Sequence, residues 1–594
     1  MSTEQYRSDN AGALRIADVG RIVQLAGWID RRRDHGGVVF VDLRDASGLI
    51  QVVFNPDSYP NDEQTISELR LEYCITVTGT IRERPEGTRN PNVITGEIEV
   101  VAESLMILGS SAPLPFQLND RSDTEEIRRL EHRYLDLRTE RMQRNLQARA
   151  LTARAMRHTL EGMGFLEVET PTLISSTPEG ARDMLVPSRL RPGTFYALPQ
   201  SPQLFKQLLM IGGVERYYQI ARCYRDEDFR SDRQLEFTQL DIEGAFWTQN
   251  DVLEAVEKII TAVVRDVRGI ELTTPFPRIS YADALERYGS DKPDARFGME
   301  IRDLSQLFAG TDFRAFAGVL SAGGAVRGIN AGAMNLRRSA LDALIDRAHE
   351  LGAKGLVWVV VQDDGSLRSP VTKHLSEEEQ TAMVSALEAN PNDLLLIVAG
   401  PQKLVESVLG QLRLDLGIPK GHQELSFLFV VDFPVFETTD EGDLVPAHHP
   451  FTAPVDIEEL RSHPETALSR SYDLVLNGSE LGSGSVRIHD PEIQAEIFEI
   501  LGIAPEEAYT RFGWFLEALK YGTPPHAGIA IGMDRLISIL QEEPNIREVI
   551  PFPKTQSGAD PLTGSPARVA DLQLKELGIE LDPEVRKAWE DEPS

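Results

Sequence analysis

The stretch Tyr224–Glu243, YRDEDFRSDRQLEFTQLDIE, carries charge on half of its residues, yet its second part alternates like a half-buried β-strand. Successive side chains of an extended chain point to opposite faces. One face then holds the small or apolar side chains of Thr238, Leu240 and Ile242. The other face holds an aromatic ring and polar groups, those of Phe237, Gln239, Asp241 and Glu243. Such a strand is either an edge strand with a solvated polar face or one wall of a charged site.

The loop ahead of this strand favours a charged site. Arg225, Arg230 and Arg233 lie where a hairpin loop leaves them room to move, and arginine suits bidentate recognition of phosphate. Phe237 lies on the polar face, where its ring can stack on a base. On these residues alone, both interpretations stay open.

A second stretch, GIAIGMDRL at residues 528–536, joins a strand of small residues to a helix through Asp534 and Arg535. Its glycines permit close backbone approach, and an arginine in the first helical turn can meet a phosphate beside the helix dipole. An ordinary strand-to-helix turn explains the same residues, so this stretch does not decide the question by itself.

Length and net charge limit the number of domains and the kinds of partner that we expect for this chain. A chain of 594 residues is too long for a single core. The net charge of −32 argues against a polyanionic partner, but net charge governs long-range steering and solubility rather than local patches. A polyanion has to bind at basic clusters such as DRRRDHGG at residues 30–37.

The sequence shows no apolar run long enough to span a bilayer and no signal-peptide pattern. Its two cysteines, Cys74 and Cys223, suit a reducing compartment. We therefore expect a cytoplasmic protein without membrane contact.

Together these stretches resemble the three motifs of class II aminoacyl-tRNA synthetases. FLEVETPTL (165–173) is similar to motif 1, CYRDEDFRSDRQLEFTQLDIE (223–243) to motif 2 and GIAIGMDRL to motif 3. Further segments are similar to bacterial aspartyl-tRNA synthetases: STPEGARD (176–183), LPQSPQLFKQLLM (198–210), AHHPFTAP (447–454) and GSGSVRIH (482–489). The resemblance covers the chain from about Ala13 to Leu581, and a chance match of so many ordered segments is negligible.

Short strands between glycine-containing turns at residues 20–108 predict a small antiparallel barrel of a kind that binds oligonucleotides. With the resemblance, we expect an α+β multidomain chain. Its parts are an OB-fold anticodon-binding barrel at 1–110, a linker at 111–140, a class II antiparallel-sheet catalytic domain at 141–288 and 423–560, an α/β insert at 289–422 and a C-terminal extension at 561–594.

The resemblance implies that Arg225 and Arg535 are catalytic, with Arg225 on the α-phosphate and Arg535 stacking against adenine opposite Phe237. The ATP-binding residues that it implies are Arg225, Asp226, Glu227, Gln234, Phe237, Glu480, Gly532, Met533, Asp534 and Arg535. Asp473 and Glu480 match the carboxylates that hold Mg²⁺, an ion that prefers hard oxygen ligands.

For L-aspartate, a pocket needs cations at the side-chain end and acceptors at the amine end. The resemblance implies these aspartate-binding residues: Glu179, Gln203, Lys206, Arg225, Asp241, His448 and Arg487. A cationic fork of Lys206 and Arg487 argues against asparagine or lysine as substrate, because a neutral amide leaves charges unpaired and an ammonium is repelled. A non-catalytic RNA-binding paralogue is a further alternative. It is disfavoured because Arg225, Asp473, Glu480 and Arg535 are all present.

In the barrel, the resemblance places Phe40 and Gln51 where they stack on and hydrogen-bond to anticodon bases. His35 and Gly87 stand where enzymes specific for tRNA(Asp) commonly have leucine and lysine. This pair resembles the non-discriminating type, which also aspartylates tRNA(Asn) for later amidation. The alternative is a strictly tRNA(Asp)-specific enzyme whose exposed loops have drifted.

Two partner expectations follow from the resemblance alone. A homodimer is implied by motif 1, and an amidotransferase is a candidate partner in tRNA-dependent asparagine formation. The role of the insert is not implied by either the residues or the resemblance.

Overall fold

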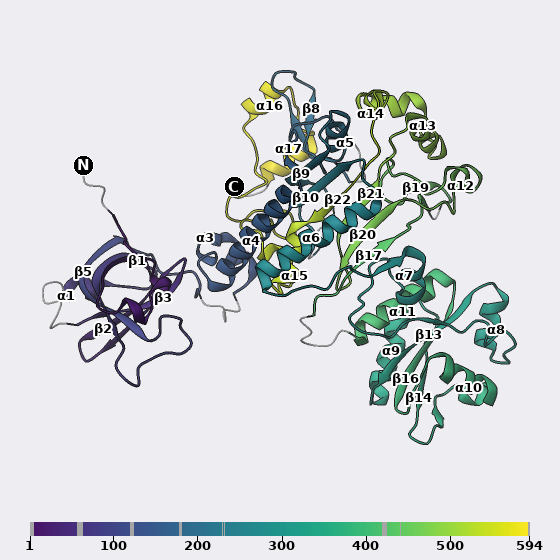
Figure 1. Ribbon diagram of the computed structural model, residues 1–594, viewed down its shortest axis with the longest axis horizontal. Helices are drawn as coiled ribbons and strands as arrows, with labels where there is room; N and C mark the ends of the chain where they lie inside the picture. Colours follow the sequence, from purple (N-terminus) through teal and green to yellow (C-terminus); the bar gives the residue numbers. More distant parts are fainter. Residues whose placement is uncertain are drawn as a thin grey trace. The chain divides into compact units, whose positions relative to one another are not determined.

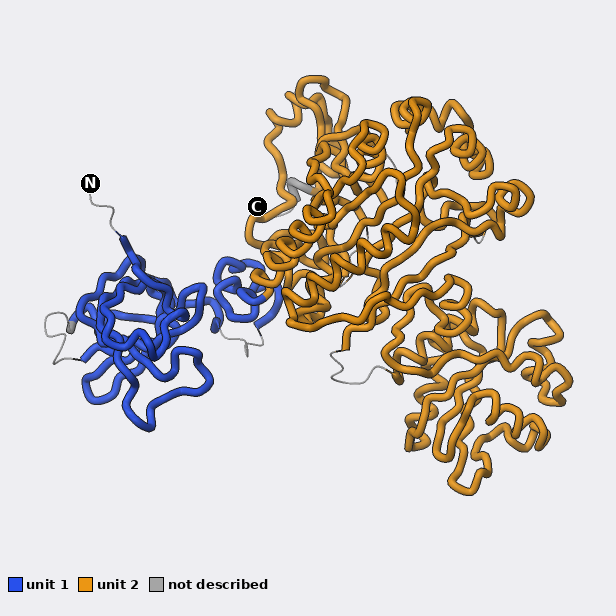
Figure 2. The backbone as a smooth tube through the Cα atoms, viewed as in Figure 1, with its two compact units in different colours: residues 1–144 blue, residues 145–594 orange. Residues whose placement is uncertain are grey.

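The computed structural model describes residues 5–55, 63–118, 124–176, 181–227, 230, 232–417, 424–439 and 441–591 (Figure 1). The chain divides into two compact units, Met1–Arg144 and Asn145–Ser594, which are coloured separately in Figure 2. Each unit is described by itself below.

The first unit is built on a closed five-stranded barrel with strand order β1-β2-β3-β5-β4. Its strands are β1 (Ile22–His35), β2 (Val38–Asp45), β3 (Gly48–Phe54), β4 (Cys74–Glu83) and β5 (Ile98–Gly109). Every second residue of β2 is buried, as expected for a strand with one face on a closed core. The predicted N-terminal β-barrel is therefore confirmed.

Short helical elements surround the barrel strands: η1 (Ala11–Ala13), η2 (Ile16–Asp18) and α1 (Glu63–Glu68). The segment predicted as a linker contains α2 (Glu126–Glu131) and α3 (Arg133–Asp136). Beyond α3, Arg138 bonds Glu72 at 2.9 Å and lies over the Trp28 ring. The end of the predicted linker is therefore attached to the barrel.

The second unit is organised around an eight-stranded sheet with order β11-β17-β20-β21-β22-β10-β9-β6. The central strands are β20 (Ser471–Leu476), β21 (Ser479–Val486), β22 (His526–Gly532), β10 (Glu236–Ala245) and β9 (Arg216–Tyr224), and they pair antiparallel. The outer strands are β17 (Phe427–Val431), β11 (Arg278–Ser280) and the short β6 (Leu166–Glu167). The predicted antiparallel catalytic sheet is confirmed; among its described strands, β11 with β17 and β6 with β9 pair parallel.

Three helices cover one face of this sheet: α4 (Glu140–Gly162), α6 (Gln249–Arg268) and α15 (Met533–Leu540). Helix α6 begins at a capping box between Thr248 and Asp251 and ends at Gly269, whose φ of 66° suits glycine. Leu240 and Ile242 of β10 are buried in the core beneath these helices. The opposite side chains of β10 therefore point away from this core.

Smaller elements surround the sheet. The strands are β7 (Leu185–Pro187), β8 (Phe195–Ala197), β18 (Phe436–Thr438) and β19 (Leu444–Pro446). The helices are α5 (Gln203–Ile211), α7 (Tyr281–Tyr288), α12 (Ile457–Ser462), α13 (Pro491–Ile500), α14 (Pro505–Ala518), η4 (Ile546–Glu548), α16 (Asp571–Leu577) and α17 (Pro583–Asp591). Among the described helices, none is both long and apolar enough to cross a bilayer.

A separate five-stranded sheet lies within the predicted insert, with order β12-β13-β16-β14-β15. Its strands are β12 (Arg302–Asp303), β13 (Ala325–Ala333), β14 (Val357–Val361), β15 (Leu367–Arg368) and β16 (Asp393–Gly400). Helices α9 (Arg338–Glu350) and α11 (Gln402–Gly417) pack on one face, and α8 (Arg314–Ser321) and α10 (Glu377–Ala386) on the other. A short helix, η3 (Thr372–His374), precedes α10. The predicted α/β character of this region is confirmed.

Arg413 of α11 fastens the segment that leads into the insert. Its guanidinium, only 1% exposed, donates to the carbonyls of Asp294, Phe297 and Gly298 at 2.6–3.1 Å. It also lies 4.2 Å from the Phe297 ring centroid. We predict that Arg413→Met destabilises the insert by about 3 kcal/mol or more, because buried carbonyls lose their donors.

Hydrogen exchange on β13 and β16 measures this loss. Arg347→Met is the matched control. It removes a partly exposed arginine of α9 that pairs with Glu350 and with Asp415 of α11, and because such exposed pairs contribute little to stability, protection should change little. Equal protection in the Arg413 variant and the wild type would contradict the prediction.

Candidate functional site

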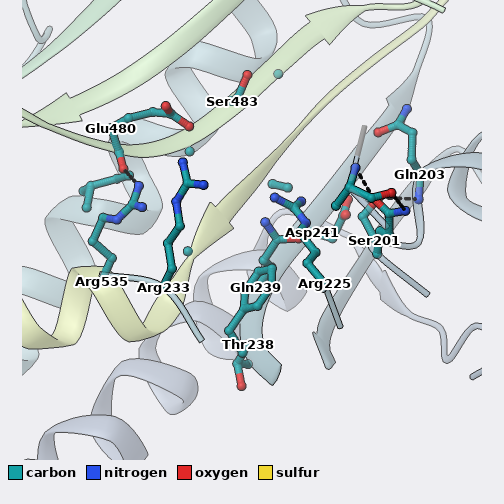
Figure 3. Close-up of a pocket in the computed structure, with 18 of the residues that line it drawn as sticks. Ser201, Gln203, Arg225, Arg233, Thr238, Gln239, Asp241, Glu480, Ser483 and Arg535 are labelled. Atoms are coloured by element: carbon teal, nitrogen blue, oxygen red, sulfur yellow. Dashed lines mark hydrogen bonds between the residues drawn. The ribbon is translucent and has the colours of Figure 1, made fainter. Parts of the chain in front are cut away.

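A cavity of about 450 Å³ opens on the face of the central sheet that the three helices leave uncovered (Figure 3). Strands β10, β21 and β22, the loop after β9 and the start of α5 supply its walls. The predicted site residues that line it are Gln203, Arg225, Glu227, Gln234, Phe237, Asp241, His448, Glu480, Arg487, Gly532, Asp534 and Arg535. The charged face of the opening stretch is thus a cavity wall.

One end of the cavity holds four buried charges of alternating sign. Lys206 Nζ lies 2.5 Å from Asp241 Oδ1 and 3.1 Å from Glu243 Oε2. Arg487 donates from Nε and Nη2 to the two oxygens of Glu243, at 3.1 and 3.3 Å. Burial of these groups is tolerable because each charge has partners of opposite sign.

Local structure makes room for this cluster. Gly528 of β22 pairs with Glu243, and a Cβ at Gly528 would lie 2.0 Å from Glu243 Oε2. The glycine thus admits the carboxylate beside the strand backbone. Arg487 Nη1 is held in turn by Ser485 Oγ at 2.7 Å, so its guanidinium has a fixed orientation.

The two acids of the cluster differ in their pKa. Burial raises the pKa of Glu243, but the charges of Arg487 and Lys206 outweigh it and lower the pKa to about 2. Burial also raises the pKa of Asp241, and Lys206 only partly opposes that rise. Asp241 is therefore the less fully compensated carboxylate.

Three polar atoms at this end are buried without a partner among the described residues: Asp241 Oδ2, Gln203 Nε2 and His449 Nε2. Buried polar groups are normally hydrogen-bonded. A free carboxylate oxygen beside the cavity suits a cationic group of a ligand, and the amide NH₂ suits an acceptor.

Arg225, Phe237 and Arg535 line the rest of the cavity, and in Figure 3 Arg535 lies beside Glu480. Arg225 has no carboxylate within ion-pair distance among the described residues, and its guanidinium carbon lies 5.1 Å from the Phe237 ring centroid. Arg535 donates to the carbonyl of Glu480 and lies 3.0 Å from Asp232. This end therefore offers cationic groups and an aromatic face to an anionic, ring-containing ligand.

Two further carboxylates are Glu480, which lines the cavity, and Asp473, which lies behind His448. His448 Nε2 is 3.2 Å from Asp473 Oδ1. Burial raises the pKa of Glu480, and the nearby Asp473 charge raises it further. Burial lowers the pKa of His448, but the bond to Asp473 and its charge produce a net rise. The pair of acids thus favours a cation close by.

His449, the neighbour of His448, also lines the cavity but differs in charge. Burial lowers its pKa to about 3, with further lowering from Arg487 and Lys206. The backbone N–H of Phe451 donates to its Nδ1 at 3.3 Å. His449 is therefore neutral at pH 7, with its proton on Nε2.

Some predicted site residues lie off the cavity wall. Lys206 and Asp473 lie behind it, each bonded to a residue that lines it. Asp226 is half-exposed beside Arg182, and the Met533 side chain is buried in a hydrophobic cluster. Glu179 lies outside the described residues. The roles that the resemblance implies for them stay predictions.

The structure adds residues that the sequence did not single out. Glu243 holds both cations, and Gln239 and Ser485 line the cavity. Period-two alternation placed Gln239 and Glu243 on the polar face and was the signal available for them. Ser485 carries no such signal, although its contact with Arg487 joins residues only two positions apart.

In the barrel, three of the four predicted tRNA-contacting residues have described partners. The His35 and Phe40 rings lie 6.1 Å apart, edge to face. Gln51 accepts from Arg33 at 3.1 Å and donates to Glu99 at 2.7 Å. Gly87 adopts a φ of 87°, and a Cβ there would meet nothing within 4 Å. The Gln51 amide is thus fixed in orientation, whereas His35 and Gly87 face open space.

Comparisons with known families give the class. Residues 125–556 match the family model described as "tRNA synthetases class II (D, K and N)", and residues 23–108 match "OB-fold nucleic acid binding domain". The chain therefore belongs to the class II tRNA synthetases of the D, K and N group and is an aminoacyl-tRNA ligase.

Individual relatives are more specific. A Moorella thermoacetica protein named "Aspartate--tRNA(Asp/Asn) ligase" is 51% identical over 97% of this chain and 96% of its own length. A Thermobifida fusca protein of the same name is 49% identical over 97% of this chain and 99% of its own. A crystal structure of Pyrococcus horikoshii asparaginyl-tRNA synthetase with asparaginyl-adenylate aligns with a TM-score of 0.58 at 18% identity, covering 93% of this chain and 97% of its own. At that identity the likeness shows the fold alone.

The buried charges make a stability prediction. We predict that Glu243→Gln costs about 3–5 kcal/mol at pH 7, because two cations lose a buried partner. The pKa of Glu243 is depressed in the folded state, so its contribution is present above about pH 4.3, its unfolded pKa, and is lost as pH falls toward 2. The difference in the free energy of unfolding between the variant and the wild type therefore becomes smaller as the pH falls.

Hydrogen exchange on β10 and β22 at pH 7 and at pH 3.5 measures the opening free energy of this region. Glu227→Gln, which removes an exposed partner of Arg233, serves as the control with little effect. The stabilising role of Glu243 would be contradicted if the Glu243 variant were as stable as the wild type at pH 7. It would also be contradicted if the difference in opening free energy grew at low pH.

Proposed function

We propose that this aminoacyl-tRNA ligase activates L-aspartate with ATP and transfers it to tRNA(Asp) and tRNA(Asn). The observation that carries the choice of amino acid is the buried cluster of Lys206 and Arg487 with Asp241 and Glu243. Without a ligand its charges cancel. Aspartate adds a side-chain carboxylate for the cations and an ammonium for Asp241 Oδ2, so the cluster stays balanced. The names of the relatives at about 50% identity support the same choice.

In the proposed reaction, an oxygen of the aspartate α-carboxylate attacks the α-phosphorus of ATP. The bond to the bridging oxygen breaks, and pyrophosphate leaves with the electron pair. The 3'-terminal ribose hydroxyl of the tRNA then attacks the carbonyl carbon of aspartyl-adenylate, and AMP leaves. Arg225 stabilises charge at the α-phosphate, while Phe237 and Arg535 hold adenine between them. Catalysis comes from positioning and charge neutralisation rather than from a covalent enzyme intermediate.

Mg²⁺ fits the pair of acids between the two ends. Among the described residues, no group of three or more His, Cys, Asp or Glu side chains is arranged to hold a metal alone. Asp473 and Glu480 supply hard oxygens, and burial, followed by the charge of Asp473, raises the pKa of Glu480. We infer that they hold Mg²⁺ together with ATP oxygens, since this ion usually bridges phosphates. The bound ion would neutralise phosphate charge.

The barrel is the proposed anticodon-binding domain. Phe40 presents a half-buried ring beside His35, and stacking on aromatic rings is the usual way in which such folds bind single-stranded bases. Gly87 lacks the side chain of the lysine that tRNA(Asp)-specific enzymes commonly carry there, and a Cβ at this position would meet nothing within 4 Å. This openness supports acceptance of both tRNAs.

Further partners belong to the proposal as well. We infer a homodimer from the motif 1 resemblance and a cytoplasmic location from the family. An amidotransferase that converts aspartyl-tRNA(Asn) is a candidate partner, because a misacylated product must be modified before use in translation.

Amino-acid choice is tested by ATP–pyrophosphate exchange with aspartate, asparagine and lysine in parallel. We expect exchange with aspartate at least about 10⁴-fold above that with asparagine, because a neutral amide leaves buried cations unpaired. Arg225→Ala should remove exchange while the protein stays folded and still binds tRNA. Exchange with asparagine at a comparable rate would refute the assignment, as would an active Arg225 variant.

Choice of tRNA is tested by charging purified tRNA(Asp), tRNA(Asn) and an unrelated tRNA with aspartate. We expect the first two to be charged. We also expect His35→Leu combined with Gly87→Lys to lower kcat/KM for tRNA(Asn) more than for tRNA(Asp). The lysine bears a strain of about 1–2 kcal/mol at positive φ, so Gly87→Ala is the matched control for the strain alone. If tRNA(Asn) is charged no better than the unrelated tRNA, the proposed acceptance of both tRNAs is wrong and the enzyme is strictly specific for tRNA(Asp).

A further inference from the structure

We propose that Arg149 and Asp534 form a positioning pair that sets the geometry of the ATP end of the cavity. The proposal deepens the proposed function and rests on it. Phe237 and Arg535 are the groups that would touch the nucleotide, and Arg149 and Asp534 act through them. Arg149 lies on α4, and Asp534 lies in the first turn of α15.

The Asp534 carboxylate accepts a backbone hydrogen bond from β10 at the point where its partner strand ends. The ladder between β10 and β22 ends at the pair Gln239 and Gly532, because the chain then turns into α15. The next backbone N–H on β10, that of Thr238, donates to Asp534 Oδ2 at 2.7 Å. A buried N–H needs an acceptor, and this carboxylate, only 2% exposed, supplies it. The strand therefore keeps its geometry beyond the end of its partner.

Arg149 of α4 holds the Asp534 carboxylate through an ion pair. Its Nη1 donates to Asp534 Oδ1, and its Nη2 donates to Thr238 Oγ1 at 2.9 Å. Thr238 is one of the residues that line the cavity, but its hydroxyl points away from Gln239 and Asp241 (Figure 3), and the arginine contacts it there. A buried carboxylate that loses its cation is strongly destabilised. Arg149 therefore holds the Asp534 carboxylate in place.

The position of Arg149 and Asp534 explains why they should affect ATP binding. Thr238 is the neighbour of Phe237, and Asp534 is the neighbour of Arg535. One contact thus fixes the backbone beside both groups that would enclose adenine. Lys206 and Arg487 at the other end depend on different partners, Asp241 and Glu243. The pair should therefore control ATP and leave aspartate binding alone.

The test is aspartate-dependent pyrophosphate exchange with Arg149→Met, Asp534→Asn and the double variant, each checked by thermal melting. We expect KM for ATP to rise about tenfold in each single variant, while KM for aspartate stays within about twofold. The double variant should recover part of the loss, because it contains no unpaired buried carboxylate. Loss of folded protein alone lowers kcat and moves neither KM, so the split in KM distinguishes positioning from stability.

Arg157→Met is the matched control. Arg157 lies on the same helix but pairs with Glu167 at an exposed position, 3.0 Å away, so KM for ATP should not change. If Arg149→Met does not fold, Arg149→Lys and Asp534→Asn are judged by the same criterion. A KM for ATP within about twofold of wild type in the folded variants overturns the proposal, as does an equal rise in both KM values. If the wild type shows no exchange with aspartate, the proposed function fails instead.

Discussion

Four buried charges, Lys206, Asp241, Glu243 and Arg487, impose the constraint on which the site depends. Charges inside a protein persist only where each has a partner of opposite sign. Strand β10, which carries Asp241 and Glu243, therefore cannot shift its register without separating them from Lys206 of α5 and from Arg487, which follows β21. Gly528 has no side chain because the Glu243 carboxylate occupies that space. In the proposed function, an aspartate adds one charge of each sign to this cluster beyond its α-carboxylate. An asparagine adds only the ammonium and leaves an excess of positive charge, so selectivity follows from the same balance that keeps the core stable.

The same strand serves stability and function because a β-strand separates its two faces residue by residue. Leu240 and Ile242 are buried under α4, α6 and α15, while Gln239 and Asp241 line the cavity. Helices cover one face of the sheet, and the cavity occupies the other. A sheet built this way exposes charged side chains to a ligand without weakening its apolar core.

How much the sequence could predict follows from the range of the contacts involved. Alternation along residues 237–243 is local, and it correctly predicted which side chains share a face. Turn signals likewise predicted the barrel strands. The pairing of Arg487 with Glu243 joins residues 244 positions apart, and no local pattern encodes it. The burial of the Met533 side chain is equally invisible, because it depends on the packing of α15 against α4 and η4. Motif order supplied by the resemblance, rather than periodicity, chose between an edge strand and a site.

The two ends of the cavity differ in how firmly their charges are held. At the amino-acid end the ion pairs are buried, and their hydrogen bonds fix each group before any ligand arrives. At the nucleotide end Arg233 pairs with Glu227 and Arg535 with Asp232, and these pairs are partly exposed. Exposed pairs contribute little to stability, so a phosphate can displace the carboxylates at small cost. Rigid charges suit the discrimination of a small amino acid, where one charge decides the outcome. In the proposed function, exchangeable pairs suit a triphosphate, whose own charges would take the place of those carboxylates.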